Sequence, residues 1–563
     1  MARTVAIGIQ DYADIIKNDY FYIDKTHFIK EWWSSGDSVT LITRPRRFGK
    51  TLNLNMLDYF FSNCHSNRGD LFEGLSIWDD EKYRQLQGTY PVISLSFANV
   101  KETTFENTIE RIYQILIDVY MKNRFLLEDH VLKPEEEVFF RSVNMKMGET
   151  TATQALHKLC DYLYHYYGKK VIILLDEYDT PMQEAYVNGF WDKLVAFTRS
   201  LFNATFKTNP YLERAIMTGI TRVSKESIFS DLNNIEVITS TSDKYATAFG
   251  FTEEEVFLAL EEGGLDEEKE GVKCWYDGFT FGSHADIYNP WSVLNFLDKG
   301  KYETYWANSS GNRLVNKLVR EGNKEIKTTF ERLLEGKSII CPIDEQIVYD
   351  QLGKKKNAIW SLLLASGYLK VLHFQRANEV TVGVLPNYEL ALTNKEVRFM
   401  FLAMVNDWFD EAGDNYSEFI QALLKGDRKA MNVYMNRMTL EIFSYFDTGK
   451  RASGAEPERF YHGFVLGLMA ALHGRYSITS NRESGFGRYD IMIEPKDMLK
   501  DAFILEFKVH DPEDEADLKE TVISALKQIE EKQYEANLIA RGFAPEQIRK
   551  YGFAFEGKRV LIG

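Results

Sequence analysis

Eight residues near the amino end, Arg44 to Thr51, have the residue types of a turn that binds phosphate. The turn ends in Gly49, Lys50 and Thr51 and leads into a helix-like stretch, so backbone N–H groups and the positive end of a helix dipole would face an anion. Lys50 would reach the outer phosphates of a nucleotide, and the Thr51 hydroxyl would bind Mg²⁺. The pattern predicts an ATP site whose contacts are Arg47, Phe48, Gly49, Lys50 and Thr51.

The usual form of this turn has a second glycine five residues before Gly49, and here Arg44 occupies that position. Taken alone, the eight residues therefore fit an ordinary basic turn equally well. The choice between the two interpretations depends on the segments that follow.

A short apolar run at 171–175 ends in two carboxylates, Asp176 and Glu177. Such a run is typical of a parallel strand buried on both faces, and ligands of parallel sheets bind at the carboxyl ends of strands. We therefore expect Asp176 to hold Mg²⁺ near the phosphates and Glu177 to polarise the attacking water as a general base. A buried strand with a solvated acidic pair is the alternative, but the preceding Gly-Lys-Thr turn favours the nucleotide site.

A third strand candidate, residues 214–222, ends in hydroxyl side chains and an arginine. At this end of a sheet, Thr218 or Thr221 would orient a water, and Arg222 would stabilise charge on the transferred phosphoryl group. The alternative is an ordinary strand end without a role in chemistry.

Two strand-like runs near the carboxyl end, 489–493 and 503–509, carry a second set of chemical groups. Period-two alternation places Glu506 and Lys508 on one face of the second strand. If Asp490 reaches across from the first strand, the two carboxylates would bind Mg²⁺, and Lys508 would orient or deprotonate a water for attack on a phosphodiester. This set predicts a nuclease site.

Glu458 begins a stretch with helical spacing of apolar residues and would supply one more carboxylate to the same metal. A first-turn acid that complements the helix dipole is the alternative for Glu458. Farther on, Gln528 and Lys532 share a helical face that would contact DNA or a metal-bound water, with an ordinary exposed face as the alternative.

With these motifs the chain resembles the bacterial AAA-ATPase-like family that carries a carboxyl-terminal nuclease-like domain of the PD-(D/E)XK superfamily. The resemblance covers nearly the whole length, and its most specific segments are residues 22–26, 43–51, 174–181, 218–222, 461–464 and 506–508. It implies ATP and Mg²⁺ as cofactors and roles for seven residues: Lys50 and Thr51 in Walker A, Asp176 and Glu177 in Walker B, and Asp490, Glu506 and Lys508 in the nuclease core.

Two departures from the family pattern concern function. Arg44 replaces the first Walker A glycine, which leaves nucleotide binding expected and the rate of hydrolysis in question. RecB-like nucleases carry glutamine and tyrosine four residues apart after the core, whereas Tyr534 here lies six residues beyond Gln528. By spacing alone, this motif is not met.

Length, net charge, cysteine content and the length of apolar runs limit the classes of protein to which the chain can belong. The 563 residues are too many for one core, and the net charge of −16 means that DNA, the expected macromolecular partner, must meet a locally positive groove. Four scattered cysteines fit a reducing cytoplasm, and no apolar run approaches the roughly 18 residues of a membrane span. Self-association into a homo-oligomer stays open.

We expect an α/β fold in four parts: a P-loop parallel-sheet domain at 1–285, a helical lid with a winged helix at 286–395, a helical connector at 396–450 and an α/β nuclease-like domain at 451–563. The function expected is an ATPase whose nucleotide state licenses a Mg²⁺-dependent nuclease acting on DNA, in defence or mobile-element biology. The alternative is a nucleotide-dependent switch or scaffold whose nuclease fold binds DNA or a protein without cleaving.

Overall fold

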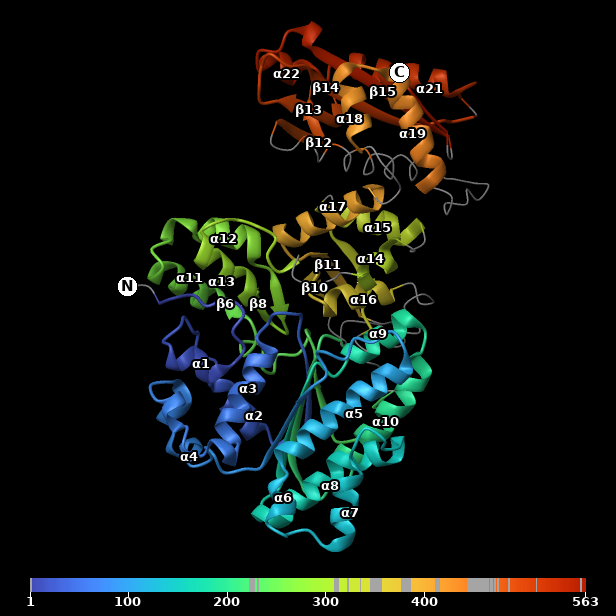
Figure 1. Ribbon diagram of the computed structural model, residues 1–563. Helices are drawn as coiled ribbons and strands as arrows, with labels where there is room; N and C mark the ends of the chain where they lie inside the picture. The colour runs from blue at the N-terminus through green and yellow to red at the C-terminus, as the bar shows by residue number, and fades with distance from the viewer. Residues whose placement is uncertain are drawn as a thin grey trace. The chain divides into compact units, whose positions relative to one another are not determined.

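The computed structural model of the chain divides into two compact units (Figure 1). The first comprises Met1–Leu318 and Ser338–Arg398, and the second comprises Val319–Lys337 and Phe399–Gly563. The structure describes residues 3–221, 228–229, 232–307, 313–320, 324–334, 336–344, 357–375, 386–410, 416–442, 465, 469, 472, 475–484, 487–512, 514–556 and 559–563.

A five-stranded parallel sheet forms the centre of the first unit. Its order is β2-β3-β4-β1-β5, so β4 lies between β1 and β3. The mainly apolar runs at 39–42 and 171–175 form the inner strands β1 and β3. Both strands are buried along their whole length because an inner parallel strand is covered on both faces. The strands are β1 (Val39–Thr43), β2 (Val92–Ser96), β3 (Val171–Asp176), β4 (Leu212–Gly219) and β5 (Ile235–Ile238).

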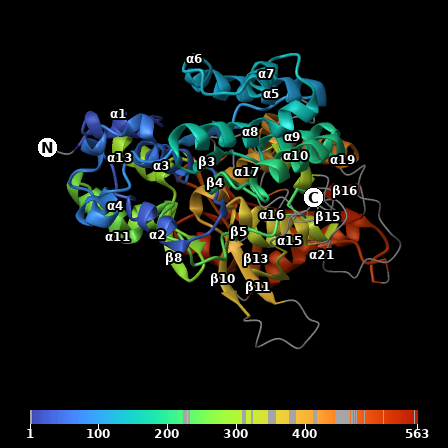
Figure 2. The same ribbon diagram turned by 90° about the horizontal axis from the view of Figure 1, so that it is seen from below.

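Helices cover both faces of this sheet (Figures 1 and 2). The helix after β1, α3 (Lys50–Phe61), lies on one face, and α8 (Glu149–Tyr167) and α10 (Trp191–Phe206) lie on the other. This division follows from right-handed crossovers, because the chain first moves outward from β1 to the edge strand β2 and then returns through β3 to β4. The remaining helices of residues 3–221 are α1 (Tyr12–Lys17), α2 (His27–Ser35), α4 (Glu81–Arg84), α5 (Phe105–Lys122), α6 (Phe125–Glu128), α7 (Pro134–Ser142) and α9 (Thr180–Asn188).

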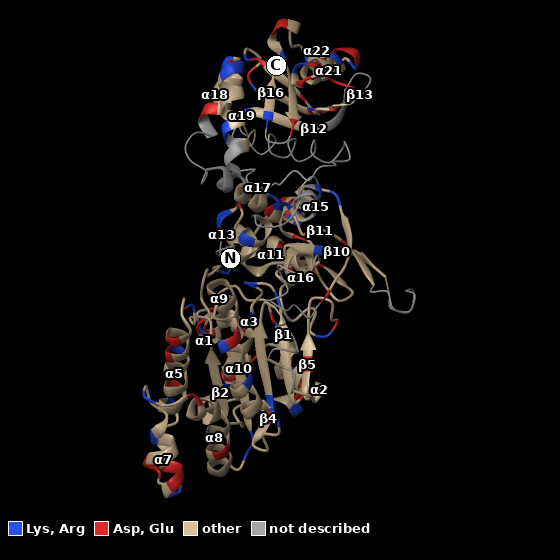
Figure 3. Cartoon of the chain, turned by 90° about the vertical axis from the view of Figure 1, so that its right-hand side faces the viewer, with Lys and Arg blue, Asp and Glu red and all other residues tan. Residues whose placement is uncertain are grey.

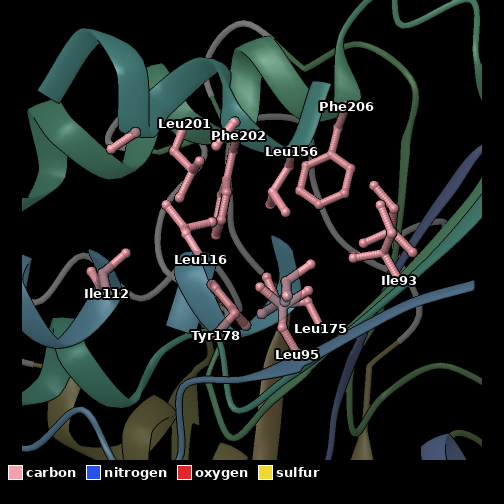
Figure 4. Close-up of a cluster of buried hydrophobic side chains, with 14 of the residues drawn as sticks. Ile93, Leu95, Ile112, Leu116, Leu156, Leu175, Tyr178, Leu201, Phe202 and Phe206 are labelled. Atoms are coloured by element: carbon pink, nitrogen blue, oxygen red, sulfur yellow. The ribbon is translucent and has the colours of Figure 1, made fainter. Parts of the chain in front are cut away.

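The core on the α8 and α10 side is built by alternate residues of the strands (Figure 4). Ile93, Leu95 and Leu175 point from β2 and β3 toward Leu156 of α8 and Phe202 of α10. Burial of these side chains holds the carboxyl ends of the strands in fixed register, which is what a site at that edge requires.

The glycine- and aromatic-rich segment 274–282 joins the parallel sheet to a small helical region. It contributes the end of α12 (Lys269–Tyr276) and β7 (Phe279–Phe281), which belongs to a three-stranded sheet with β6 (Phe251–Thr252) and β8 (His284–Tyr288). The rings of Phe279 and Phe281 pack edge-to-face on Phe48, at centroid distances of 4.8 and 5.5 Å. The aromatic residues of this segment therefore pack an internal contact. The neighbouring helices are α11 (Glu253–Glu262) and α13 (Pro290–Lys299).

The middle region contains a helix followed by a small antiparallel sheet. After α16 (Ala358–Ala365), strands β10 (Leu369–Phe374) and β11 (Asn387–Leu392) pair antiparallel, and β9 (Ile339–Pro342) pairs with β11. One helix before an antiparallel sheet of order β10-β11-β9 is consistent with a winged-helix module, which remains a prediction. The chain also forms the helices α14 (Arg313–Arg320), α15 (Lys324–Leu334) and α17 (Lys395–Asp410). Of these, α15 belongs to the second unit, and α14 and α17 each span a boundary between the two units.

The carboxyl-terminal sheet has the order β12-β13-β14-β15-β16. Its pairs are antiparallel except β14 with β15, which run parallel because α21 (Leu518–Glu531) and α22 (Ala536–Ala540) form the crossover between them. Its strands are β12 (Tyr476–Ser484), β13 (Gly487–Pro495), β14 (Ala502–Val509), β15 (Ile548–Glu556) and β16 (Arg559–Ile562), with α18 (Tyr416–Lys425) and α19 (Arg428–Ile442) packed in the same unit.

A run of acids, Glu135 to Glu137, lies at the start of α7, which is red in Figure 3. Among the described helices, none combines the length and the apolar content that crossing a membrane would need.

Candidate functional site

The turn between β1 and α3 has the backbone of a phosphate-binding loop. Gly49 precedes the first turn of α3 with a φ of 80°, and Arg47 also has a positive φ, 65°. Left-handed conformations at these two residues reverse the chain tightly, so that the loop ends at the amino terminus of the helix. The predicted strand, turn and helix are therefore all present at residues 39–61.

Lys50 is almost completely buried beneath the loop. Its Nζ donates hydrogen bonds to the carbonyls of Arg44 and Pro45, both at 3.1 Å, and lies 3.5 Å from Oε1 of Glu177. The structure thus brings together the lysine of the turn and Glu177, the residue that follows β3.

Asp176 is the point at which three predicted residues meet. Its Oδ2 accepts a hydrogen bond from the Thr51 hydroxyl at 2.7 Å, and its Oδ1 accepts one from the Thr218 hydroxyl at 2.5 Å. Thr218 reaches Asp176 because β4 is the direct neighbour of β3, with Leu175 opposite Met217 in the register. A hydroxyl beside a carboxylate is the oxygen set that Mg²⁺ prefers.

The two carboxylates after β3 have different electrostatic surroundings. Burial and the charge of Glu177 raise the pKa of Asp176, against the hydrogen bonds from Thr218 and Thr51. Burial also acts to raise the pKa of Glu177, but Lys50 and Arg46 outweigh it and lower that pKa overall. Glu177 is therefore ionised at neutral pH. Its φ of 53° is strained for a non-glycine residue, as functional positions often are.

The side chains of the other two predicted loop contacts point into aromatic surroundings. Phe48 is buried against Phe279 and Phe281, so only its main chain is available to a phosphate. Arg47 is exposed, and its guanidinium carbon lies 4.2 Å from the centre of the Trp291 ring. This cation–π contact ties the loop to the start of α13.

The sequence motifs gave no role to one residue of this site, Asp179. Asp179 is fully buried, and its Oδ2 accepts hydrogen bonds from the main chain of Ile220 at 3.0 Å and of Thr221 at 2.8 Å. The Thr221 hydroxyl also donates to it, at 2.9 Å, so Thr218 faces Asp176 and Thr221 faces Asp179. Asp179 lies two residues after Glu177, and this closeness to the acidic pair is the signal that could have identified it.

The carboxyl-terminal set lies on the adjacent strands β13 and β14. Ile491 pairs with Leu505, so Asp490 and Glu506 are next to each other in the antiparallel register. Asp490 Oδ2 accepts a hydrogen bond from the Phe507 main chain at 2.8 Å. Burial raises the pKa of Asp490 to about 6, although that hydrogen bond and the Lys508 charge act to lower it. The predicted core residues therefore lie together.

Gln528 and Tyr534 touch each other despite their spacing in the sequence. Gln528 Nε2 donates a hydrogen bond to Oε1 of Glu506 and lies 3.2 Å from the Tyr534 hydroxyl. The helix α21 ends at Glu531, and Gln533 takes a φ of 50°, which turns Tyr534 back toward the helix. The reversal of the chain thus brings Tyr534 to Gln528, although the two residues lack the four-residue spacing of a shared helical face. Lys532 is exposed.

Two predicted site residues, Arg222 and Glu458, lie outside the described residues. Within the part of the chain that the structure describes, no group of three or more His, Cys, Asp or Glu side chains is placed to hold a metal ion.

The fold and these two sites define a two-part protein, with a P-loop nucleotide-binding domain and a nuclease-like α/β domain. Residues 6–229 match the family model described as a predicted AAA-ATPase, and residues 456–563 match that of the PD-(D/E)XK nuclease superfamily. The chain therefore carries an AAA-ATPase-like domain followed by a domain of the PD-(D/E)XK nuclease superfamily, which confirms the resemblance and the fold class expected from the sequence.

One curated relative is an uncharacterized protein in the vnfD 5′ region of Azotobacter chroococcum mcd 1. It is 24% identical over 400 residues, which cover 70% of this chain and 68% of the relative. A solved structure, the Aeropyrum pernix ORC2 protein in its ADPNP-ADP complexes, covers 68% of this chain and 92% of its own at 10% identity, with a TM-score of 0.25.

Proposed function

We propose that this protein binds ATP with Mg²⁺ at its P-loop and that the bound nucleotide licenses a Mg²⁺-dependent nuclease domain that acts on DNA. The single observation that supports the nucleotide site most strongly is the cluster at Asp176, where Thr51 and Thr218 donate to one carboxylate. The ends of β3 and β4 and the first turn of α3 converge there, beside the buried Lys50.

Each residue of the first site has a defined role in this proposal. The main chain of Arg47 to Gly49 and the Lys50 ammonium would bind the phosphates, while Thr51 and Asp176 would hold Mg²⁺. Bound Mg²⁺ would neutralise charge on the phosphate oxygens. Glu177 would accept the proton of the attacking water, since its lowered pKa keeps it ionised. Thr218 would orient that water, and Arg222 would stabilise charge on the transferred phosphoryl group, as predicted from the sequence.

In the second site, Asp490, Glu506 and the sequence-predicted Glu458 would hold Mg²⁺, which would activate a water and polarise the phosphodiester. Lys508 would orient that water. Gln528 would keep the Glu506 carboxylate in position through its hydrogen bond.

Nucleotide binding is tested by titrating a fluorescent ATP analogue into the wild-type protein and into Lys50→Ala in the presence of Mg²⁺. We expect loss of measurable affinity in Lys50→Ala and no change in Lys146→Ala, a matched substitution at an exposed position. Equal affinity in all three proteins would exclude the P-loop as the nucleotide site.

Nuclease activity is tested by incubating the protein with DNA and Mg²⁺. Asp490→Ala and Lys508→Ala should abolish strand cleavage, whereas Lys527→Ala, at an exposed position of α21, should leave it unchanged. Cleavage that persists in both site variants would mean that the proposed site is not responsible.

The second candidate function keeps the nucleotide site but makes the nuclease fold a DNA- or protein-binding module. Arg44 in place of the first glycine favours this candidate, because a loop that departs from the usual pattern is consistent with tight binding and slow turnover. A nucleotide-linked gain in DNA affinity without strand cleavage would support it over the first proposal.

The cytoplasm is the proposed location, since all four cysteines are free and two of them, Cys160 and Cys341, are buried as thiols. Defence or mobile-element biology is the proposed setting for an ATPase joined to a nuclease, and a homo-oligomer is the proposed state to test by light scattering with and without ATP.

A further inference from the structure

Arg44, the residue in place of the first P-loop glycine, is completely buried. Its main-chain N–H donates to the carbonyl of Gly219 at 3.1 Å, and its own carbonyl accepts a hydrogen bond from Lys50 Nζ at 3.1 Å. The residue therefore connects the end of β1 to the end of β4 and to the lysine of the nucleotide site.

The guanidinium of Arg44 extends this connection to β5. Its Nη1 donates to the carbonyls of Thr43 at 3.0 Å and Thr239 at 2.7 Å, while Nη2 makes longer contacts, 3.4 and 3.5 Å, with the carbonyls of Lys244 and Tyr245. Its carbon lies 4.3 Å from the centre of the Phe281 ring. Among the described residues, its hydrogen-bond acceptors are all main-chain carbonyls.

A buried cation that is held only by carbonyls and an aromatic face is an expensive arrangement. Burial lowers the pKa of Arg44 to about 9, which reflects this cost. The cost is offset where the rigid, forked donors of the guanidinium hold together backbone segments that would otherwise separate. Here the segments are the carboxyl ends of β1 and β5 and the turn at 244–245, and the phosphate-binding loop begins at this junction.

We propose that Arg44 is a positioning residue of the nucleotide site, which tethers the start of the P-loop to the end of β5 and so sets the position of Lys50. The proposal rests on the proposed ATP site. Its consequence is opposite to what the sequence pattern suggests: restoring glycine at this position should weaken nucleotide binding, because the tether is lost.

The test compares three variants by titration with a fluorescent ATP analogue and Mg²⁺. Arg44→Gly restores the usual pattern. Arg44→Lys keeps the charge but lacks the second donor nitrogen, which in arginine contacts the Lys244 and Tyr245 carbonyls. Arg141→Met is a control at an exposed position of α7. We expect about a tenfold or greater loss of affinity in both Arg44 variants, from the loss of charge-assisted hydrogen bonds, and none in the control.

A positioning role is separated from a loss of folding by chemical rescue. Low concentrations of guanidinium should restore part of the affinity of Arg44→Gly by occupying the vacated space, whereas the same concentration of sodium chloride should not. If Arg44→Gly does not fold, Arg44→Lys provides the comparison.

Wild-type affinity in Arg44→Gly, or in Arg44→Lys where only that variant folds, would overturn the proposal. Weakened affinity in a folded Arg44→Gly that guanidinium fails to improve would also count against the tether. Absence of nucleotide binding by the wild-type protein would instead refute the ATP site itself, so the two failures are distinguishable.

Discussion

At the scale of single residues, the side chains of the proposed nucleotide site hold one another in position. The Asp176 carboxylate accepts one hydroxyl on each oxygen, and Lys50 lies on loop carbonyls beside Glu177. Groups arranged in this way need little reorganisation to receive Mg²⁺ and phosphate.

The first prediction concerns the Thr51 hydroxyl. Thr51→Val keeps the shape of the side chain but removes the oxygen that contacts Asp176, so the Mg²⁺-dependent part of ATP affinity should fall by about 10- to 100-fold. Titrations with Mg²⁺ and with EDTA measure that part. Thr51→Ser should retain it, and a valine variant that keeps the full Mg²⁺ effect would contradict the role of Thr51.

The second prediction concerns Glu396, a fully buried carboxyl that accepts hydrogen bonds from the Trp306 main chain and the Ser292 hydroxyl. Burial raises its pKa from 4.5 to about 7 against these hydrogen bonds. Between these values the folded protein binds the proton that the unfolded chain has released. The contribution of Glu396 to stability is therefore full below about pH 4.5 and decreases as the pH rises to about 7.

Denaturant unfolding of the wild-type protein and of Glu396→Gln across this range measures the effect. The free energy of unfolding of the wild type, relative to the variant, should fall by about 3 kcal/mol as the pH rises. A difference that does not change with pH would show that Glu396 has an ordinary pKa in the folded protein.

At the scale of elements, strand order and a helix end bring together the groups that sequence spacing separates. Because β4 is inserted between β1 and β3, Thr218 lies beside Asp176, although the two are 42 residues apart. In the second unit, the reversal at Gln533 returns Tyr534 to Gln528. Both contacts arise from how elements meet, and neither follows from a local pattern.

The third prediction follows from the end of α21. Gln528→Ala removes the donor to Glu506 and should lower Mg²⁺-dependent DNA cleavage by about tenfold or more, without a comparable change in thermal stability. Lys527→Ala, an exposed neighbour on the same helix, is the control. Undiminished cleavage in Gln528→Ala would show that Glu506 is positioned by other contacts.

At the scale of the whole molecule, the chain carries two chemically distinct sites in two units and a net charge of −16. The proposed action on DNA requires a locally positive surface on this acidic protein, and it predicts that DNA affinity falls steeply with salt. The proposed coupling also requires that the occupant of the first site alter the activity of the second.

The fourth prediction tests this coupling in the full-length protein. Adding ATP should raise the rate of DNA cleavage by the wild type and by Lys146→Ala, but not by Lys50→Ala. The rates are measured at one Mg²⁺ concentration and with ATP chelation corrected. An equal ATP response in wild type and Lys50→Ala would mean that the P-loop does not control the nuclease domain.

Local patterns in the sequence determined the strand, turn and helix at 39–61, the buried strand that ends at Asp176, and the alternation that places Glu506 and Lys508 on one face. These features depend on residues that are close together in the sequence. Their turn-forming residue types and the periodicity of their apolar side chains can be identified without the fold.

Only the tertiary structure decided that Thr218 binds Asp176, that Tyr534 meets Gln528, and that Arg44 is a buried tether at the start of the loop. The physical reason is that each of these contacts joins segments whose approach is set by strand order and by the packing of a shared core. Residue spacing along one segment carries no information about that approach.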